Sequence, residues 1–247
     1  MRQHMNSRII LITGANGALG RATAQAFLDE SPGNFVWFGI NRRREHAEAL
    51  AATNPGRCRI ISLDVTMPDA WKSVVAEIVA VHQRLDVLIN NAGTHDDALL
   101  AQMKWESWHG VLAVNLDGVF HGCQAVMPVM ISQRNGRIVN VASLSALVAP
   151  PGQTNYAAAK AGVVALTQSL AKEVARIGIT VNAVCPGYLD TEALAGLDAA
   201  AKKKALEQIP MRRFGKPKEV AAAIRFLACA EAGYITGSAL KIDGGIF

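Results

Sequence analysis

Short apolar runs alternate with longer helical stretches along the whole chain. Seven of these runs lack the polar alternation of a half-exposed strand, which is typical of strands that are covered on both faces. The runs occupy residues 8–13, 34–40, 58–65, 86–90, 136–143, 179–185 and 239–243. The helical stretches between them can supply right-handed crossovers. The pattern therefore predicts an α/β fold with a doubly wound, seven-stranded parallel sheet and helices on both of its faces.

No repeat, low-complexity tract or composition shift divides the 247 residues, so we expect a single domain spanning 1–247. The stretch at about 189–210 differs from the rest, because it carries three consecutive lysines and several alanines between two Pro/Gly signals. A substrate lid and a plain solvated surface helix explain this stretch equally well. Trp105, Trp108 and Phe120 lie at helical spacing, which favours packing over a ligand-binding role.

Composition excludes several classes of protein. Apolar residues make up 51% of the chain and charged residues 18%, and the net charge of +5 is too small for a nucleic-acid partner. No apolar run approaches the length of a membrane span, and the first run is too short for a signal peptide. The four cysteines and six histidines lack metal-ligand spacing. We therefore expect a cytoplasmic protein with buried free thiols, no metal and no membrane or nucleic-acid partner.

A glycine-rich turn follows the first apolar run and leads into a helix. Small residues let the backbone approach a pyrophosphate, whose charge the free amide groups at the helix start can hold. The residues concerned are Gly14, Asn16, Gly17, Leu19 and Gly20. They do not match GxGxxG, and a purely structural turn would have the same composition, so this loop alone favours cofactor binding only weakly.

The end of the second apolar run indicates which dinucleotide would fit. An acidic residue there accepts from a ribose 2′-hydroxyl, whereas an arginine pairs with a 2′-phosphate. Asn41 and Arg42 stand at this place, and no carboxylate occurs before Glu45. The sequence therefore favours NADP(H) over NAD. Arg43 and Arg44 are more easily explained as the start of a solvated helix.

Tyr156 and Lys160 stand four residues apart in a strongly helical stretch, so they lie on one face. A phenol with a pKa of about 10 is a poor acid or base at pH 7 unless a neighbouring charge stabilises its phenolate. An ammonium group in a partly dry cleft could lower the pKa of the phenol enough. Taken alone, however, such a pair is common on helices and would most often be an exposed pair.

Further motifs accompany this pair in a fixed order. They are TGxxx(A/G)xG at 13–20, NNAG at 90–93, Asn115, Ser143, YxxxK at 156–160 and PGxxxT at 186–191. Together they resemble the short-chain dehydrogenase/reductase family, across nearly the whole chain. The resemblance implies a Rossmann-like fold and an NADP-dependent oxidoreductase. Gly17 stands where NADP-using members often have arginine, which leaves Arg42 as the main determinant for the 2′-phosphate.

Within that family the chain is most similar to the 3-oxoacyl-[acyl-carrier-protein] reductases. This similarity is carried by PGQTNYAAAKAG (151–162), ITVNAVCPGYLDTE (179–192), IPMRRFGKPKEVAAAIRFLA (209–228) and YITGSALKIDGG (234–245). It implies reduction of a 3-oxoacyl thioester, on acyl carrier protein, in fatty-acid or related polyketide or polyene biosynthesis. It also implies a homotetramer, and it makes Arg134 and Arg176 candidates for docking the acidic carrier beside the cleft.

The resemblance implies a role for each motif residue. Tyr156 would protonate the substrate carbonyl, Lys160 would lower the pKa of Tyr156 and hold the ribose, and Ser143 would donate a hydrogen bond to the same oxygen. Asn115 would orient a water behind Lys160. Simpler interpretations are a helix-capping amide for Asn115 and an ordinary strand-end hydroxyl for Ser143. The implied cofactor contacts are Asp64 and Val65 at the adenine, Asn91, Ala92 and Gly93 at the ribose, and Pro186, Gly187, Leu189 and Thr191 near the carboxamide and pyrophosphate.

Two other functions remain open at this point. One is a reductase or dehydrogenase of the same fold that acts on another ketone or secondary alcohol. The other is a non-catalytic NADP-binding regulator, against which the intact Asn115, Ser143, Tyr156 and Lys160 argue. The segment 95–97 is more easily explained as a solvated loop than as a border of the substrate mouth.

Overall fold

The seven predicted strands form one parallel sheet in the computed structural model, which describes residues 7–192 and 198–247. Their order is β3-β2-β1-β4-β5-β6-β7, and every neighbouring pair is parallel. The strands are β1 (Ile9–Thr13), β2 (Phe35–Ile40), β3 (Cys58–Ser62), β4 (Val87–Asn90), β5 (Gly136–Val141), β6 (Ile179–Pro186) and β7 (Ala239–Ile242). The predicted doubly wound α/β fold is confirmed.

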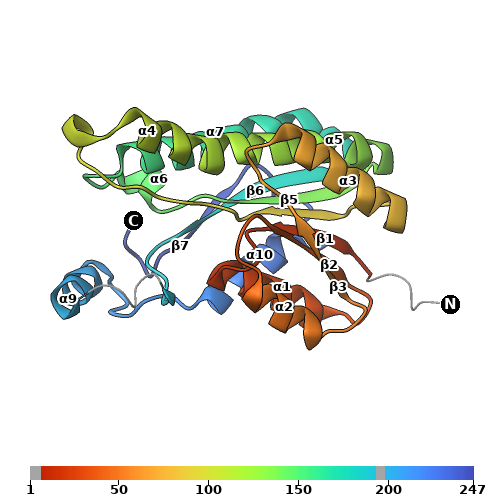
Figure 1. Ribbon diagram of the computed structural model, residues 1–247, viewed down its shortest axis with the longest axis horizontal. Helices are drawn as coiled ribbons and strands as arrows, with labels where there is room; N and C mark the ends of the chain where they lie inside the picture. The colour runs from red at the N-terminus through yellow and green to blue at the C-terminus, as the bar shows by residue number, and fades with distance from the viewer. Residues whose placement is uncertain (1–6, 193–197) are drawn as a thin grey trace.

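Helices cover both faces of the sheet (Figure 1). One layer consists of α1 (Ala18–Glu30), α2 (Glu45–Ala52) and α10 (Pro217–Leu227), and the opposite layer of α3 (Pro68–His82), α5 (Gly118–Gln133) and α7 (Thr154–Val174). The short helices α4 (Trp105–Leu112) and α6 (Ser145–Val148) precede α5 and α7. Because the strand order reverses between β1 and β4, the loops after these strands diverge and leave space at their carboxyl ends.

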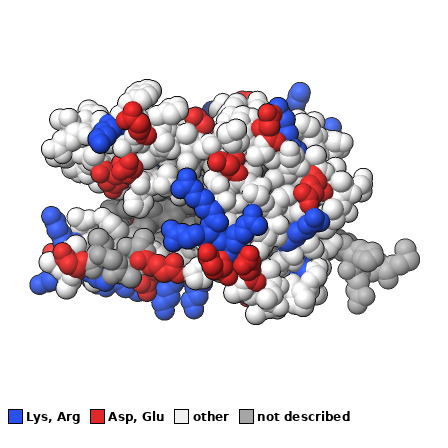
Figure 2. Space-filling view, in the orientation of Figure 1, with Lys and Arg blue, Asp and Glu red and all other residues white. Residues whose placement is uncertain are grey.

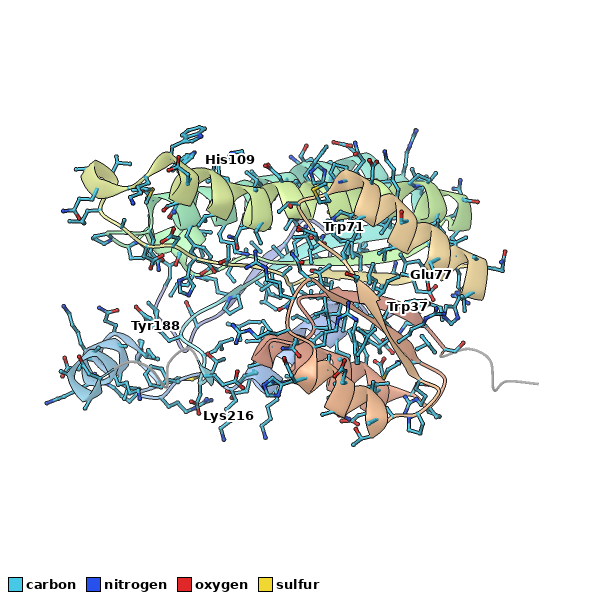
Figure 3. The ribbon with its side chains drawn as sticks, viewed as in Figure 1. Trp37, Trp71, Glu77, His109, Tyr188 and Lys216 are labelled. Carbon is cyan, nitrogen blue, oxygen red and sulfur yellow. The ribbon has the colours of Figure 1, made fainter. Side chains whose placement is uncertain are left out.

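The sheet is buried on both faces at its centre and less so at its edges. All residues of β1 and β6 are buried, whereas the edge strands β3 and β7 are only partly buried. This explains why the central runs lack polar alternation. Trp37 and Trp71 are fully buried in the cluster on the α3 and α5 side, where Figure 3 labels them.

The predicted lid coincides partly with a described helix. Residues 193–197 of the predicted segment lie outside the described residues, and α9 (Ala199–Gln208) begins after them. Asp198 caps α9, and Ala205 is the one buried residue within it. Figure 1 shows α9 standing away from the sheet, while Leu189 is bridged to Gly215 and Ile209 is buried. The lid therefore remains a prediction. Leu189 and Ile209, near the two ends of the predicted segment, are held against the rest of the protein.

Two expectations about single side chains are met only in part. Trp105 and Phe120 are 69% and 46% exposed in this chain, because they stand on the outer faces of α4 and α5. Cys58 and Cys229 are only half-buried, whereas Cys123 and Cys185 are buried. Within residues 7–192 and 198–247, no helix has the length and hydropathy needed to span a bilayer.

Candidate active site

A cavity of about 1420 Å³ opens at the carboxyl ends of the strands, at the switch point between β1 and β4. Figure 2 shows the hollow between the two helical layers. The loops after β1, β2, β4, β5 and β6 contribute to its lining. The predicted residues that line it are Gly14, Asn16, Gly17, Leu19, Gly20, Asn41, Arg42, Asn91, Ala92, Gly93, Ser143, Tyr156, Lys160, Pro186, Gly187, Leu189 and Thr191.

Close packing against neighbouring backbone requires glycine at two positions of the turn after β1 and the start of α1. Gly14 has φ +63°, and a Cβ there would lie 2.9 Å from the Cα of Ala92. A Cβ on Gly20 would lie 2.5 Å from the Gly14 carbonyl oxygen. No side chain caps α1, so its first amide groups are available to an anion in the cavity. Asn91 holds the loop by donating from Nδ2 to the Thr13 carbonyl oxygen (2.9 Å).

Basic side chains stand at the rim of this cavity (Figure 2). Arg42 and Arg43 both line it, whereas Arg44 does not, so Arg43 is a site residue that the sequence interpretation assigned to a solvated helix. Asn16 fixes this region, because its Oδ1 accepts from the amide groups of His46 (3.0 Å) and Ala47 (3.1 Å) at the start of α2. The rim is therefore suited to a phosphate group.

Asp64 and Val65 lie outside the main cavity. Asp64 lines a second cavity of about 450 Å³ that shares Asn41 and Arg42 with the first. The hydroxyl of Thr66 donates to Asp64 (2.7 Å), and this hydrogen bond lowers the pKa of the carboxyl. The Val65 side chain is buried, and its carbonyl oxygen accepts from Trp71 Nε1 (3.0 Å).

Lys160 lies buried on α7 beside the strand β5. Its Nζ donates to the Val141 carbonyl oxygen (2.8 Å) and lies 5.7 Å from the centre of the Tyr156 ring. Burial lowers the pKa of Lys160 to about 8. At neutral pH the side chain is therefore still an ammonium group, held in a dry environment where its field is strong.

The surroundings of Tyr156 shift its pKa. Burial raises this pKa above its ordinary value, the hydrogen bond with the Ser143 hydroxyl lowers it, and the Asp97 carboxylate raises it further. The net direction is upward, because desolvation of the phenolate outweighs the hydrogen bond with Ser143, and the lowering by Lys160 stays a prediction. The phenol is held in its protonated form, as a proton donor.

Asn115 lies behind the cavity, in the short π-helical element η2 (Ala113–Asp117) between α4 and α5. Its Nδ2 donates to the carbonyl oxygens of Val111 (2.9 Å) and Thr94 (2.6 Å). A Cβ on Gly93 would lie 2.9 Å from Asn115 Oδ1 and 3.7 Å from Lys160 Nζ. Asn115 therefore serves the helix backbone and also lies near the ammonium group. A π-helical turn at this place is typical of a functional site.

The substrate side of the cavity contains residues that no motif indicated. His95, Asp97, Ser145, Gln153, Tyr188 and Gln208 all line it. His95 and Asp97 thus border the cavity, although the segment 95–97 is exposed to solvent. The His95 ring stands edge-on to Tyr156 at 6.5 Å, and the Tyr188 hydroxyl donates to Gln208 Oε1 (3.4 Å) across to α9. Figure 3 places Tyr188 between the sheet and α9.

Arg134 and Arg176 do not flank this chain's own cleft. Arg134 ends α5 just before β5 begins, and Arg176 lies in η3 (Ala175–Ile177) just before β6 begins. Both residues therefore lie at the amino ends of the parallel strands (the amino edge of the sheet), whereas the cavity opens at the carboxyl ends (the carboxyl edge). The expectation of basic residues beside the cleft is not met within one chain.

Comparison with known proteins agrees with this site. A family model described as enoyl-(acyl carrier protein) reductase matches residues 14–246. The chain is 46% identical to a 3-oxoacyl-[acyl-carrier-protein] reductase of Thermotoga maritima, with 98% of each chain covered. It is 39% identical to such a reductase of Synechocystis, with 98% of each chain covered, and 40% identical to one of Haemophilus influenzae, with 98% of this chain and 99% of that protein covered. This chain therefore belongs to the short-chain dehydrogenase/reductase family.

Proposed function

We propose that the protein is an NADPH-dependent oxidoreductase that reduces a 3-oxoacyl thioester, carried by an acyl carrier protein, to the 3-hydroxyacyl thioester. The observation that carries this proposal is that Ser143, Tyr156 and the buried Lys160 line one cavity together with the glycine loop. Fatty-acid biosynthesis, or a related polyketide or polyene pathway in the cytoplasm, would use this reaction. The names of relatives that match over 98% of this chain support the substrate class.

The residues present fit a nicotinamide dinucleotide. The glycine loop and the uncapped start of α1 would hold the pyrophosphate, and Asp64 would contact the adenine side. Arg42 and Arg43 would pair with the 2′-phosphate of NADPH, which is the basis of the proposed preference over NADH. When bound, the cofactor supplies a hydride to the substrate carbonyl carbon.

The chain's own side chains would handle the proton. Tyr156 is protonated and would donate its proton to the carbonyl oxygen as negative charge develops there. Ser143 would donate a hydrogen bond to the same oxygen, and the Lys160 ammonium would stabilise the phenolate that remains. Asn115, near Lys160 Nζ, would orient the water that returns a proton.

In this proposal, docking of the carrier protein depends on the oligomer. Because Arg134 and Arg176 stand at the edge opposite the cavity, they would dock a carrier only for the cleft of another copy of the chain. A homotetramer built through α4, α5 and α7 would bring such edges near a neighbouring cleft. The exposed Trp105 and Phe120 on α4 and α5 support this packing.

The rate of NADPH oxidation with acetoacetyl-CoA and with acetoacetyl carrier protein tests the function. Wild type is compared with Tyr156→Phe, and NADPH with NADH. We expect turnover that requires Tyr156, prefers NADPH and improves on the carrier. Turnover only on other ketones or alcohols would indicate a different substrate. Tight NADPH binding without turnover of any carbonyl compound would indicate a non-catalytic regulator and contradict the proposal.

A further inference from the structure

A chain of hydrogen bonds connects the mouth of the cavity with the catalytic pair. Gln153 precedes α7 and lies three residues before Tyr156. Its Nε2 donates to Asp97 Oδ2 (2.7 Å), and its Oε1 accepts from Ser145 Oγ (2.8 Å). Because both ends of the amide are used, the side chain of Gln153 has one orientation.

Ser145 links this amide to the catalytic serine. The backbone N–H of Ser145 donates to Ser143 Oγ (3.1 Å), and Ser143 and Tyr156 both line the cavity. A hydroxyl group that accepts on one side directs its own proton elsewhere. The contact with Ser145 therefore occupies an acceptor site of Ser143 Oγ and leaves the hydroxyl proton available to a substrate carbonyl in the cavity.

Asp97 is itself held in place from both sides. The amide of its neighbour Ala98 donates to the Gly152 carbonyl oxygen (2.9 Å), and Asn155 Nδ2 donates to the carbonyl oxygen of its other neighbour, Asp96 (3.0 Å). The loop after β4 is thus fixed against the start of α7 at the point where Asp97 meets Gln153. The backbone on both sides of Asp97 is therefore hydrogen-bonded, and its exposed carboxylate meets Gln153 at the mouth of the cavity.

We propose that Asp97, acting through Gln153 and Ser145, is a positioning residue that holds Ser143 and Tyr156 in the geometry needed to donate to the substrate carbonyl. This inference rests on the proposed function, because it concerns the same site. It assigns a role to an exposed carboxylate that belongs to none of the sequence motifs.

The charge of Asp97 has a second effect on Tyr156. The groups around the phenol are Lys160 on α7, His95 and Asp97 on the loop after β4, and Cys185 of β6, which interacts with Ser143 and Lys160. Among these, the Asp97 carboxylate raises the pKa of Tyr156, because a phenolate beside a negative charge is destabilised. Asp97 therefore also helps to keep the phenol protonated.

Three variants separate the positioning effect of Asp97 from the effect of its charge. Asp97→Asn keeps an oxygen acceptor for Gln153 and removes the charge, Asp97→Ala removes both, and Ser145→Ala removes the next link. We expect Asp97→Ala and Ser145→Ala each to lower kcat about 10-fold with the KM for NADPH unchanged, and the double variant to be no worse than either, because the links act in series. Asp97→Asn should keep kcat at neutral pH within about 2-fold.

The effect of the Asp97 charge on Tyr156 can be measured without turnover. The phenolate absorbance of Tyr156, obtained as wild type minus Tyr156→Phe, should titrate about half a pH unit lower in Asp97→Asn. Asp96→Asn is the matched control, since only the backbone of Asp96 contributes a contact, and it should change neither kcat nor the titration.

The outcomes distinguish this inference from the proposed function. Wild-type kcat in Asp97→Ala, or a lower melting temperature with unchanged kcat and titration, would overturn the positioning role. A wild type that reduces no thioester would overturn the proposed function instead, and the phenolate titration of Asp97→Asn would still report whether Asp97 acts on Tyr156.

Discussion

The ammonium group of Lys160 lies in a buried site, where the loss of hydration destabilises its charged form. Lys160 is buried, and this burial lowers its pKa from 10.5 to about 8. We therefore predict that Lys160→Met abolishes reduction yet raises the free energy of unfolding by roughly 1 to 3 kcal/mol at pH 7. Denaturant unfolding of the two proteins checks this. Between pH 8 and 10.5 the unfolded wild-type chain still binds the proton that the folded chain has released, so the stability of wild type rises with pH. The difference in unfolding free energy between wild type and Lys160→Met should therefore shrink.

The same pKa governs activity. Below about pH 8 Lys160 is an ammonium group, and above it the group becomes neutral and no longer stabilises a phenolate. We predict that kcat/KM for thioester reduction falls as the pH rises through about 8. A pH profile of wild type at saturating NADPH measures this, and a flat profile from pH 7 to pH 9 would contradict the assignment.

Arg42 and Arg43 are predicted to determine the preference for NADPH. Replacing either with alanine removes a cation from the rim of the cavity, and we expect the KM for NADPH to rise about 10-fold or more for each, since charge-assisted pairs of this type contribute about 1.5 to 3 kcal/mol. The KM for NADH should stay the same. Arg44→Ala is the matched control, because Arg44 does not line the cavity, and an equal effect in all three variants would point to general surface charge.

At the scale of elements, the β1–α1 junction depends on two glycines very differently. A Cβ on Gly20 would lie 2.5 Å from the Gly14 carbonyl oxygen and 2.7 Å from the Cα of Ala15, both of which are backbone atoms. A Cβ on Gly17 would lie 3.5 Å from its nearest neighbour. We predict that Gly20→Ala lowers the free energy of unfolding by about 2 kcal/mol and weakens NADPH binding, because the loop must shift.

Gly17→Ala provides the comparison for that change. It adds the same methyl group three residues earlier, at ordinary van der Waals distance from the protein, so stability should stay close to wild type. Calorimetry of the two variants with NADPH decides the point. Equal losses in both would mean that the loop responds to any added side chain rather than to the close backbone approach.

The elements themselves were predictable because their signals are local. The apolar runs predict all seven strands to within a few residues, since a strand buried on both faces needs an unbroken apolar run. The glycine loop and the pair of Tyr156 and Lys160 were equally accessible, because each lies within a few consecutive residues.

What the sequence did not reveal depends on contacts between distant elements. The hydrogen bonds of Gln153 to Asp97 and Ser145 join the loop after β4 to the segment between β5 and α7, and no spacing rule connects residues 56 and 8 positions apart. The raised pKa of Tyr156 follows from burial and from the charge of Asp97, which only the folded chain brings together. The exposure of Trp105 likewise depends on which side of α4 faces the body of the molecule.

At the scale of the whole molecule, the two edges of the parallel sheet have separate tasks. The carboxyl edge holds the cavity, because the loops there diverge at the switch point. The amino edge holds Arg134 and Arg176 and has no part in that cavity. A carrier bound at the amino edge could reach a catalytic centre only if another copy of the chain places its cleft beside that edge. The proposed carrier specificity and the proposed tetramer thus depend on each other.

The outer surface of α4 and α5 provides the test of that assembly. Trp105, Phe120 and Ile131 are 69%, 46% and 47% exposed, which is costly for apolar side chains unless another copy covers them. We predict that Phe120→Glu shifts the molecular mass in solution from tetramer toward smaller species, as measured by light scattering after size exclusion. Turnover on the carrier-bound substrate should fall more than turnover on acetoacetyl-CoA, since only the carrier needs the edge of a second copy. Val81→Glu changes a side chain on α3 that is 52% exposed, and it should alter neither mass nor turnover. An unchanged mass in Phe120→Glu would remove α5 from the proposed interface.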